Sequence, residues 1–388
     1  MSQVFAQPRA AADCKPKRPP KLREARLEDF AQIVSLTAPY RFATSQWTEE
    51  QWRHVWRNNP VHQRLGENFS TGWVLEADRR IVGHVGHVPL WFQFEGRQLT
   101  ISYGYTFVVE REYRGYAPFL LDQYENQQGI DVVVGHQVNL DSLKSHLALG
   151  ARPVPLGAWD RKAVWITDHQ EFIADWLGRK NLPAAGLLSY PAALALSMKD
   201  ARDRMLLRRH ARGEAAIEMS AAFDERFDSF WQELCAEYPE RFLACRSRAS
   251  LEWRFHFALR ERRLWIATIS RGGRLRAYAI FLLQKNSHPQ DHLRRLIVAD
   301  FQSLDRDEGI YYAMLRGALE QSRKSGIHLL VTVGISASGT DMSATAPYRN
   351  RLPQHSTSLY KSLDAQLSKA LENPQVWCPT LYDADLSL

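Results

Sequence analysis

Residues 102–151 place a strand, a short glycine-containing turn, a helix, a second strand and a second helix in succession. No other stretch of the chain restricts the fold as much. A turn at a helix N-terminus offers backbone N–H groups without intrahelical partners and the positive end of the helix dipole, so it suits a phosphate group. The stretch therefore predicts an α/β fold with a site for a phosphorylated ligand.

The length of 388 residues exceeds one typical core, so we expect two domains. No apolar run approaches the roughly 20 residues of a membrane span, and the N-terminus lacks the apolar region of a secretory signal. The four cysteines are scattered without a Cys-x-x-Cys pair, which argues against a disulfide framework or a zinc site. These features predict a cytoplasmic protein without a metal.

The net charge of +7 is concentrated in two places. Residues 1–21 and residues 199–212 each carry an excess of four positive charges, which leaves the remainder at −1. A nucleic-acid-binding face would spread basic residues over the folded surface, so we do not expect that partner. The first segment predicts a disordered basic tail. The second is either a solvated helix face or a site for an anionic surface or acceptor.

The segments before residue 102 predict alternating helices and strands. A short strand from Leu22 precedes a helix that begins near Asp29, and Thr48 is the predicted N-cap of a helix at 48–57. Three strands follow at 72–77, 81–94 and 97–110. In the middle strand, His84 and His87 are three residues apart and should lie on opposite faces, which favours structural roles over a shared metal.

The turn and its helix resemble the acyl-CoA-binding core of the GCN5-related N-acetyltransferase (GNAT) superfamily. The family turn reads Gln/Arg-x-x-Gly-x-Gly/Ala, and its best register here begins at Glu112. Gly115 and Ala117 match, Glu112 replaces the usual Gln or Arg, and Arg114 supplies a nearby cation. The resemblance implies that the following helix, predicted at 119–127, points its N-terminus at the CoA pyrophosphate.

The same resemblance assigns the residues that hold acetyl-CoA or another acyl-CoA. The backbone of the strand end should pair with the pantetheine arm, and the turn should surround the pyrophosphate. The cofactor-binding residues implied in this way are Phe107, Val108, Val109, Tyr113, Arg114, Gly115, Tyr116, Ala117 and Asn139.

After the strand at 131–135, the family pattern continues with Asn, with Tyr seven residues later and Gly eleven residues later. Asn139 starts that count, His146 stands at the tyrosine position, and Gly150 matches the glycine. The family tyrosine commonly protonates the departing CoA thiolate, and imidazole, with an unperturbed pKa of about 6.5, can do the same. His146 is therefore either the general acid or a helix-surface residue.

The implied reaction is direct attack of an amine on a thioester, without a metal or a covalent enzyme intermediate. Glu110 and Tyr105 are the leading candidates to accept the proton of the amine. By strand alternation, Tyr103, Tyr105 and Phe107 should share one face. The tryptophans at 47, 52 and 56 either line the acceptor side, as the family arrangement implies, or belong to the core.

From residue 217 the pattern of the first half is repeated, with strands at 264–269, 275–284, 293–301 and 327–334 and a helix at 307–324. This copy lacks the glycine turn and carries acidic residues where a pyrophosphate would lie. We therefore predict two tandem GNAT-like folds of the α/β class, each with a mixed, mostly antiparallel sheet flanked by helices.

The predicted division places the acyl-CoA domain at 22–166, a helical linker at 167–215 and the second fold at 216–388. Residues 153–166 should give closing strands of the first domain, and Pro183 and Pro191 should interrupt the linker helices. The aromatic and acidic segment at 377–385 should cap the cleft or pack as a last strand.

These features favour an N-acyltransferase that uses acyl-CoA and an amine acceptor. Two alternatives stay open. Glu112 and the missing tyrosine favour a non-catalytic sensor or scaffold, whereas the tandem arrangement and the basic segment favour an aminoacyl transferase of the FemAB-like type.

Overall fold

The structure is a computed structural model that describes residues 19–40, 47–66, 69–155, 161–180, 185–211, 216–285, 292–305, 307–333, 336–337, 340–341, 346–351 and 357–384. Residues 1–18 of the predicted basic tail lie outside the described residues, whereas Lys21 begins the first strand. No helix within the described ranges is long and apolar enough to cross a membrane.

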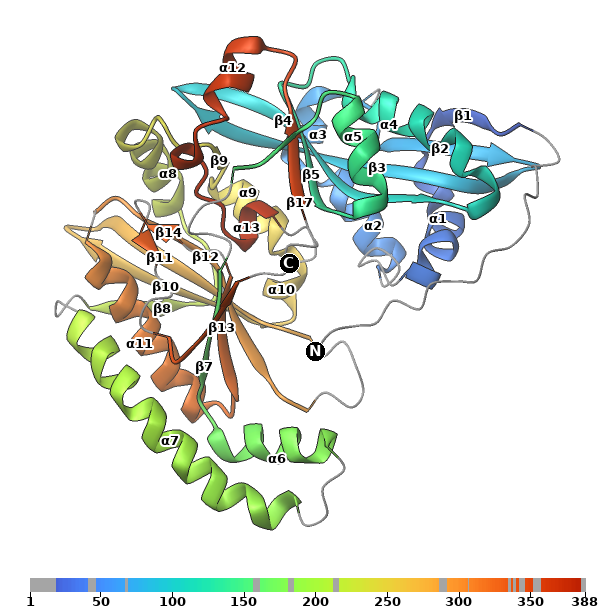
Figure 1. The fold of residues 1–388 in the computed structure, drawn as a ribbon. Helices are drawn as coiled ribbons and strands as arrows, with labels where there is room; N and C mark the ends of the chain where they lie inside the picture. The colour runs from blue at the N-terminus through green and yellow to red at the C-terminus, as the bar shows by residue number, and fades with distance from the viewer. Residues whose placement is uncertain are drawn as a thin grey trace.

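The first half of the chain alternates strands and helices (Figure 1). Its elements are β1 Lys21–Glu24, α1 Phe30–Thr37, α2 Glu49–Arg57, α3 Pro60–Leu65, β2 Gly72–Ala77, β3 Arg80–Phe94, β4 Arg97–Val109, the 3-10 helix η4 Arg111–Tyr116, α4 Ala117–Glu125, β5 Val132–Val138, α5 Leu140–Ala148, β6 Arg152–Pro153 and β7 Arg161–Ile166.

A helical hairpin follows, and then the second half. The elements are α6 His169–Arg179, α7 Ala185–His210, β8 Ile217–Ser220, α8 Arg226–Glu237, β9 Leu243–Ala244, α9 Arg248–Arg254, α10 His256–Arg260, β10 Leu264–Arg271, β11 Arg274–Leu283, β12 Arg295–Ser303, α11 Glu308–Lys324, β13 Leu329–Val333, β14 Ser336–Ala337, β15 Thr340–Asp341, β16 Tyr348–Arg351, β17 Thr357–Lys361, α12 Ala365–Ala370 and α13 Leu381–Ala384.

Most predicted elements are confirmed to within a few residues. The strands predicted at 72–77, 81–94 and 97–110 are β2, β3 and β4. The Thr48 hydroxyl accepts the N–H of Gln51, and the Gln51 side chain accepts the N–H of Thr48 at 2.8 Å. This reciprocal pair satisfies two N–H groups that the first turn leaves without partners and so fixes the start of α2.

The two halves repeat one topology. One sheet has the order β1-β2-β3-β4-β5-β17-β6, and the other has the order β16-β7-β13-β12-β11-β10-β8. In the first, β3 and β4 are antiparallel, β4 and β5 are parallel, and α4 connects the parallel pair. In the second, β11, β12, α11 and β13 have the same arrangement. The predicted tandem fold with mixed sheets is therefore confirmed.

The two sheets exchange strands. The expectation that residues 153–166 close the first sheet is wrong for β7, which lies between β13 and β16 of the second sheet. The corresponding place beside β5 is taken by β17 from the C-terminal part. Trp165 and Ala163 of β7 pack into the core of the second sheet. Sequence pattern identified the strand but not its partner, because strand-forming residues suit any half-buried sheet position.

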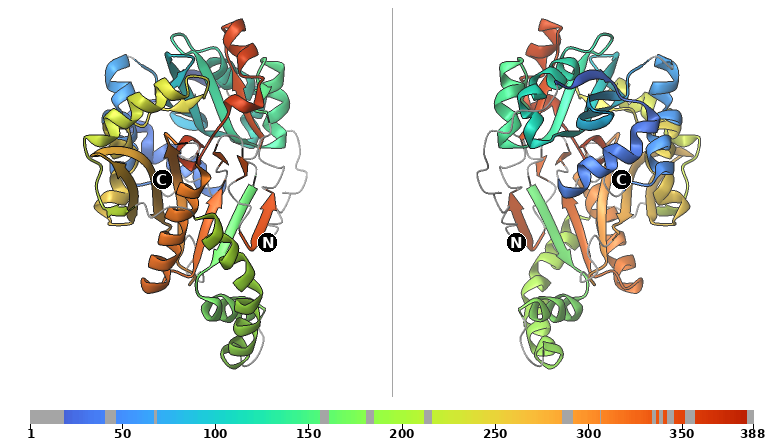
Figure 2. Two further views of the ribbon diagram at one scale, coloured as in Figure 1. Left: turned by 90° about the vertical axis from the view of Figure 1, so that its left-hand side faces the viewer. Right: turned by 90° about the vertical axis from the view of Figure 1, so that its right-hand side faces the viewer.

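The hairpin of α6 and α7 occupies the predicted linker. Pro191, which we expected to interrupt the helix, lies inside α7, and Pro183 falls outside the described residues. A proline within a helix often bends it without ending it, provided that the flanking turns keep their own hydrogen bonds. The hairpin extends from the second sheet, away from α4 and α5 (Figures 1 and 2).

A single hydrophobic cluster joins the halves. It includes Trp52 of α2 and Ile101 of β4 together with Phe227 of α8 and Tyr278 of β11. In addition, β9 of the second half pairs with β3 of the first. Because burial of apolar surface is the main favourable contribution to folding, we expect the halves to stabilise each other.

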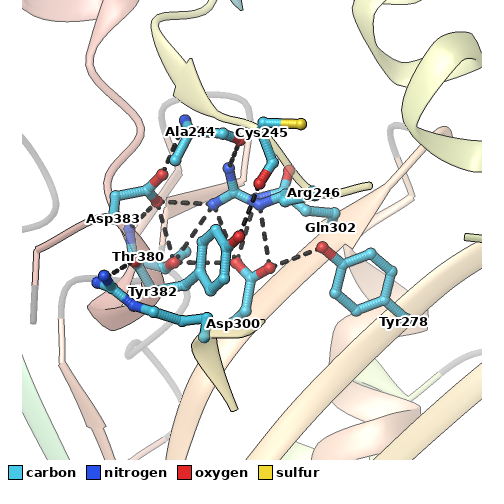
Figure 3. Close-up of polar contacts among 10 residues, drawn as sticks. Ala244, Cys245, Arg246, Tyr278, Asp300, Gln302, Thr380, Tyr382 and Asp383 are labelled. Atoms are coloured by element: carbon cyan, nitrogen blue, oxygen red, sulfur yellow. Dashed lines mark hydrogen bonds and ion pairs between the residues drawn. The ribbon is translucent and has the colours of Figure 1, made fainter. Parts of the chain in front are cut away.

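At the junction, the fully buried guanidinium of Arg246 binds two carboxylates (Figure 3). Its Nε donates to Asp300 of β12 at 3.0 Å, and its Nη2 donates to Asp383 of α13 at 2.7 Å. The Tyr278 hydroxyl donates to Asp300 at 2.6 Å, and the Thr380 hydroxyl donates to the same carboxylate at 2.9 Å. The network attaches the C-terminal segment to the second sheet.

This attachment corrects one expectation for the segment at 377–385. Within its described part, Trp377 makes a single parallel bridge with Phe242 and Leu381–Ala384 form the short helix α13, so these residues do not form a last strand. Asp383 of this helix forms an ion pair with Arg246, and Trp377 is buried in the shared core. The alternative role as a cap over the cleft stays a prediction.

We expect Arg246→Met to lower the free energy of unfolding by about 3–5 kcal/mol, because it leaves two buried carboxylates without their cation. Urea unfolding at pH 7.5 would measure the loss. Arg248→Met is the matched control, since Arg248 pairs with Glu252 at an exposed site and should matter far less. Equal stability of the Arg246 variant and the native chain would contradict a structural role for the network.

Candidate functional site

The strands β4 and β5 separate partway along their length. Their parallel pairing ends at Gly104 and Gly135, although β4 continues to Val109 and β5 to Val138. Tyr124 of α4 lies at this point, where a Cβ atom on Gly104 would come within 2.6 Å of the Tyr124 hydroxyl. Glycine at 104 therefore allows an aromatic side chain to pack beneath the divergence.

A pocket occupies the gap between the separating strands. The Tyr124 hydroxyl donates to the Val134 carbonyl at 2.8 Å and so forms part of its floor. Asn139 caps α5 by accepting the N–H of Ser142 at 2.8 Å, which places the start of that helix at the rim. The lining residues are Val85, Gly104, Tyr105, Thr106, Phe107, Leu121, Tyr124, Gly135, Val138, Asn139, Ser142 and His146. The pocket thus brings together four of the predicted site residues.

A β-bulge lies in β4 beside the pocket. Gly86 of β3 pairs with Thr106 and His87 pairs with Gly104, so Tyr105 has no opposite residue. The extra residue reverses the alternation beyond it. Tyr105 packs against the cluster that contains Trp52, whereas Phe107 packs against the opposite cluster with Tyr124. The expectation that Phe107 shares a face with Tyr105 is therefore wrong.

Tyr105 is enclosed by aromatic rings. Its ring lies 5.6 Å from Trp47, 6.3 Å from Trp52 and 5.8 Å from Trp56 between centroids. The hydroxyl is buried without a hydrogen-bond partner among the described residues, and burial raises the pKa of Tyr105 well above 10. A phenol in this environment holds its proton. Trp52 and Trp56 are fully buried, so these two are core residues, while Trp47 is half-buried.

His146 on α5 forms a buried pair with Glu125 at the end of α4. Its Nδ1 lies 2.6 Å from the Glu125 carboxylate, and only 5% and 3% of the two side chains are exposed. The carboxylate favours a proton on Nδ1, which leaves Nε2 as the ring nitrogen available to the pocket. The alternative that His146 is a helix-surface residue is therefore wrong.

Sequence reasoning missed Glu125. A usable signal was present, because Glu125 follows Leu121 by four residues and Tyr124 by one, on the apolar stripe of α4. A carboxylate on such a stripe is rarely buried without a partner. The partner comes from a different helix, 21 residues away in the chain, which no helical spacing reveals.

The predicted glycine turn is a 3-10 helix, η4, that continues directly into α4. Tyr113, Tyr116 and Ala117 pack against the core under the first sheet, whereas Arg114 and Gly115 are exposed. A Cβ atom on Gly115 would meet no atom within 4 Å, so the fold itself does not require glycine here. None of these residues lines the pocket.

Glu110 lies between β4 and η4 but does not line the pocket. Its carboxylate accepts hydrogen bonds from both terminal nitrogens of Arg80, one of them at 2.8 Å. Val108 and Val109 are buried in the two core clusters on either side of β4. The structure therefore gathers Tyr105, Phe107, Asn139 and His146 at the pocket and separates Glu110 from it.

Neither protein-family models nor curated protein sequences give a match to the chain. Solved structures do give matches to the chain. A GCN5-related N-acetyltransferase from Anabaena variabilis aligns over 89% of this chain and 73% of its own, with a TM-score of 0.51 and 12% identity. The chain has the tandem GNAT fold. A probable N-acyltransferase from Enterococcus faecalis aligns over 90% of this chain and 74% of its own, with a TM-score of 0.54 and 10% identity.

A third aligned structure is the N-myristoyltransferase of Saccharomyces cerevisiae with bound myristoyl-CoA. It aligns over 91% of this chain and 81% of its own, with a TM-score of 0.52 and 9% identity. At such identities the similarity establishes the fold and no particular chemistry. It agrees with the acyltransferase architecture that the order of strands and helices predicts.

The second GNAT-like sheet repeats both the bulge and the end of pairing. Its parallel strands pair as far as Val298 and Thr332, and Ala299 has no opposite residue in β11. Asp300 follows the bulge as Thr106 does in the first sheet. Here, however, Arg246 and Thr380 bind Asp300. The corresponding position of the second sheet is thus engaged by the chain's own side chains.

Two buried histidines flank the first GNAT-like sheet. His84 lies 6.1 Å from the Tyr105 ring, and His87 stacks on Trp73 at 5.3 Å. They contact opposite clusters, as their spacing predicts, and neither ring has a hydrogen-bond partner among the described residues. Burial lowers the pKa of both from 6.5 to about 3.

These two histidines should make the protein acid-sensitive. Between pH 6.5 and 3 the unfolded chain takes up protons that the folded chain cannot, so stability is full above pH 6.5 and falls below it. From pH 7.5 to 5.5 we expect them to account for a loss of about 3 kcal/mol in the free energy of unfolding. Urea unfolding at both pH values measures it.

The double variant His84→Phe/His87→Phe should lose most of this pH dependence, because neither ring then titrates. His292→Phe is the control, since His292 is exposed and its removal should leave the slope unchanged. If the free energy of unfolding of the double variant still fell as steeply with pH, the acid sensitivity would belong to other groups.

Proposed function

We propose that this protein is an acyl-CoA-dependent N-acyltransferase that moves an acetyl or longer acyl group to an amine. The observation that supports it most directly is the pocket at the divergence of β4 and β5, which is lined by His146, the partner of the buried Glu125. The fold alone would not support the proposal, because one fold serves many functions.

The gap suits an extended chain with amide groups. Beyond Gly104, β4 keeps its ladder to β3 but has no further pairing with β5. The pantetheine arm of an acyl-CoA carries two amides and fits such an edge as an added strand would. The backbone of Phe107, Val108 and Val109 would then bind the arm, and Asn139 lies across the gap from it.

The turn before α4 would receive the pyrophosphate. Arg114 and Gly115 are exposed there, and the open space at Gly115 leaves room for a close approach to the backbone. Tyr113, Tyr116 and Ala117 support the turn through packing. The contact of the helix N-terminus with an anion needs only backbone N–H groups and the helix dipole.

His146 would carry the proton between the two reacting groups. As the amine nitrogen bonds to the thioester carbon, Nε2 accepts the amine's proton, and it returns that proton to the CoA sulfur as the C–S bond breaks. Glu125 holds Nδ1 and stabilises the imidazolium that forms between these steps. Glu110 and Tyr105 remain predictions as proton acceptors, and the Arg80 pair and the buried phenol disfavour both.

The first experiment tests binding. Acetyl-CoA and a long-chain acyl-CoA should raise the unfolding temperature of the native chain, because a ligand that binds only the folded state stabilises it. Gly115→Glu adds a negative charge facing open space and should weaken the affinity roughly tenfold or more. Gly178→Glu is the matched control, because a Cβ atom there also meets no atom within 4 Å. The absence of any shift with either acyl-CoA would refute the proposal.

The second experiment tests the proton carrier. His146→Ala should lower kcat by about 10²–10⁴-fold, the usual contribution of a positioned acid–base group. Glu125→Gln should lower kcat by about tenfold or more, because the imidazolium that forms during the reaction loses the carboxylate that stabilises it. Asp122→Asn, an exposed carboxylate change on the same helix, should leave kcat unchanged.

An unchanged kcat in His146→Ala would remove the proton-carrier role while leaving acyl-CoA binding intact. Binding that depends on Gly115, together with no acyl transfer to a panel of amines, would support the sensor alternative that Glu112 favours.

A further inference from the structure

The helix α7 is apolar on two opposite sides. Its inner side packs against α6 and α11, with Ala193 and Leu207 buried. On the outer side, Tyr190, Leu194 and Met198 are exposed by 61%, 65% and 70%. A surface helix normally turns a polar face to water, so an exposed apolar stripe opposite the packed face requires an explanation.

The stripe follows helical geometry. Tyr190, Leu194 and Met198 are four residues apart, and Met205, exposed by 57%, falls on the same line two turns later. The stripe runs about 22 Å along the helix at 1.5 Å per residue. Exposed Trp176 of α6 adds a further large apolar side chain to the same hairpin.

Positive charge accompanies the stripe. Arg202, Arg208 and Arg209 are exposed, and Lys199 is exposed with its Nζ 5.2 Å from the Tyr348 ring. Among the described side chains of α7, the exposed ones include no carboxylate, because Asp200 is buried against His169. Among the side chains that the structure describes, the outer face therefore combines an apolar stripe with cations.

We propose that the outer face of α7, which we define by Tyr190, Leu194, Met198, Met205 and the arginines at 202, 208 and 209, docks on an anionic lipid bilayer. Helices of this composition lie in the plane of the membrane, with apolar side chains below the headgroups and Lys/Arg among the phosphates. A second copy of the chain would carry the same cations, so self-association would bring like charges together.

The arrangement of the molecule suits this occupant. The α6–α7 hairpin extends beyond the second sheet at one end of the molecule (Figures 1 and 2), so a flat surface can approach it. The elements that line the pocket lie at the other end of the molecule. Docking therefore leaves the pocket open to water. The inference does not depend on the proposed acyl transfer.

Sedimentation with vesicles tests the proposal on the full chain. The native protein should sediment with phosphatidylcholine vesicles that contain 30% phosphatidylserine and stay in solution with phosphatidylcholine alone. Binding should weaken between 50 and 300 mM NaCl, because salt screens the attraction to the charged surface. Two variants separate the components, namely Leu194→Ser/Met198→Ser/Met205→Ser and Arg202→Gln/Arg208→Gln/Arg209→Gln.

Each variant should lower the partition coefficient roughly tenfold or more, since both components contribute to interfacial binding. Leu363→Ser is the control, because Leu363 is exposed by 63% on the loop before α12. All three proteins should keep the native unfolding temperature. Failure of the native chain to sediment with anionic vesicles, or unchanged binding by both variants, would overturn the proposal. So would a native dimer that the serine variant converts to monomer without any vesicle binding.

Discussion

The exchange of strands between the two sheets is the constraint on which the rest of the structure depends. β7 completes the C-terminal sheet and β17 completes the N-terminal one, so neither half forms its sheet from its own continuous segment. Such pairings join residues far apart in the sequence, and their loop-closure entropy must be offset by the burial they permit. The shared cluster around Trp52 and Tyr278 supplies that burial. The two halves should therefore fold as one cooperative unit, although their topology is that of a repeat.

The same local strand geometry occurs in both sheets, but its surroundings differ between them. Each sheet contains a bulge beside the last residue of its parallel pair, at Tyr105 and at Ala299. In the first sheet the strands then separate around a pocket, with His146 and Glu125 buried beside it. In the second sheet, Arg246 donates hydrogen bonds to Asp300 and to Asp383, and Asp383 belongs to the C-terminal helix α13. Backbone groups that a sheet leaves unpaired need other hydrogen-bond partners, which a ligand or another segment of the chain can supply.

Local signals in the sequence predicted much of this structure, and long-range partners limited the rest. Thr48, Asn139 and the strands of the first half are set by neighbours within a few residues, so their positions could be predicted closely. His146 could be named as a candidate because its position in the family motif is also local. Its partner Glu125 and the place of β7 depend on which elements meet in space. The bulge at Tyr105 also escaped prediction, since one unpaired residue changes which side chains share a face while leaving the strand pattern intact.

Burial affects the titratable side chains of the first GNAT-like sheet in two different ways. Burial keeps the Tyr105 phenol protonated and His84 neutral, so both add packing to the site without exchanging protons near neutral pH. His146 is equally buried, but a carboxylate 2.6 Å from Nδ1 can stabilise its charged form. In the proposed reaction, His146 is therefore the one of these three groups that carries the proton. The carboxylate partner, more than the residue type, distinguishes His146 from His84 and His87, whose rings have no hydrogen-bond partner among the described residues.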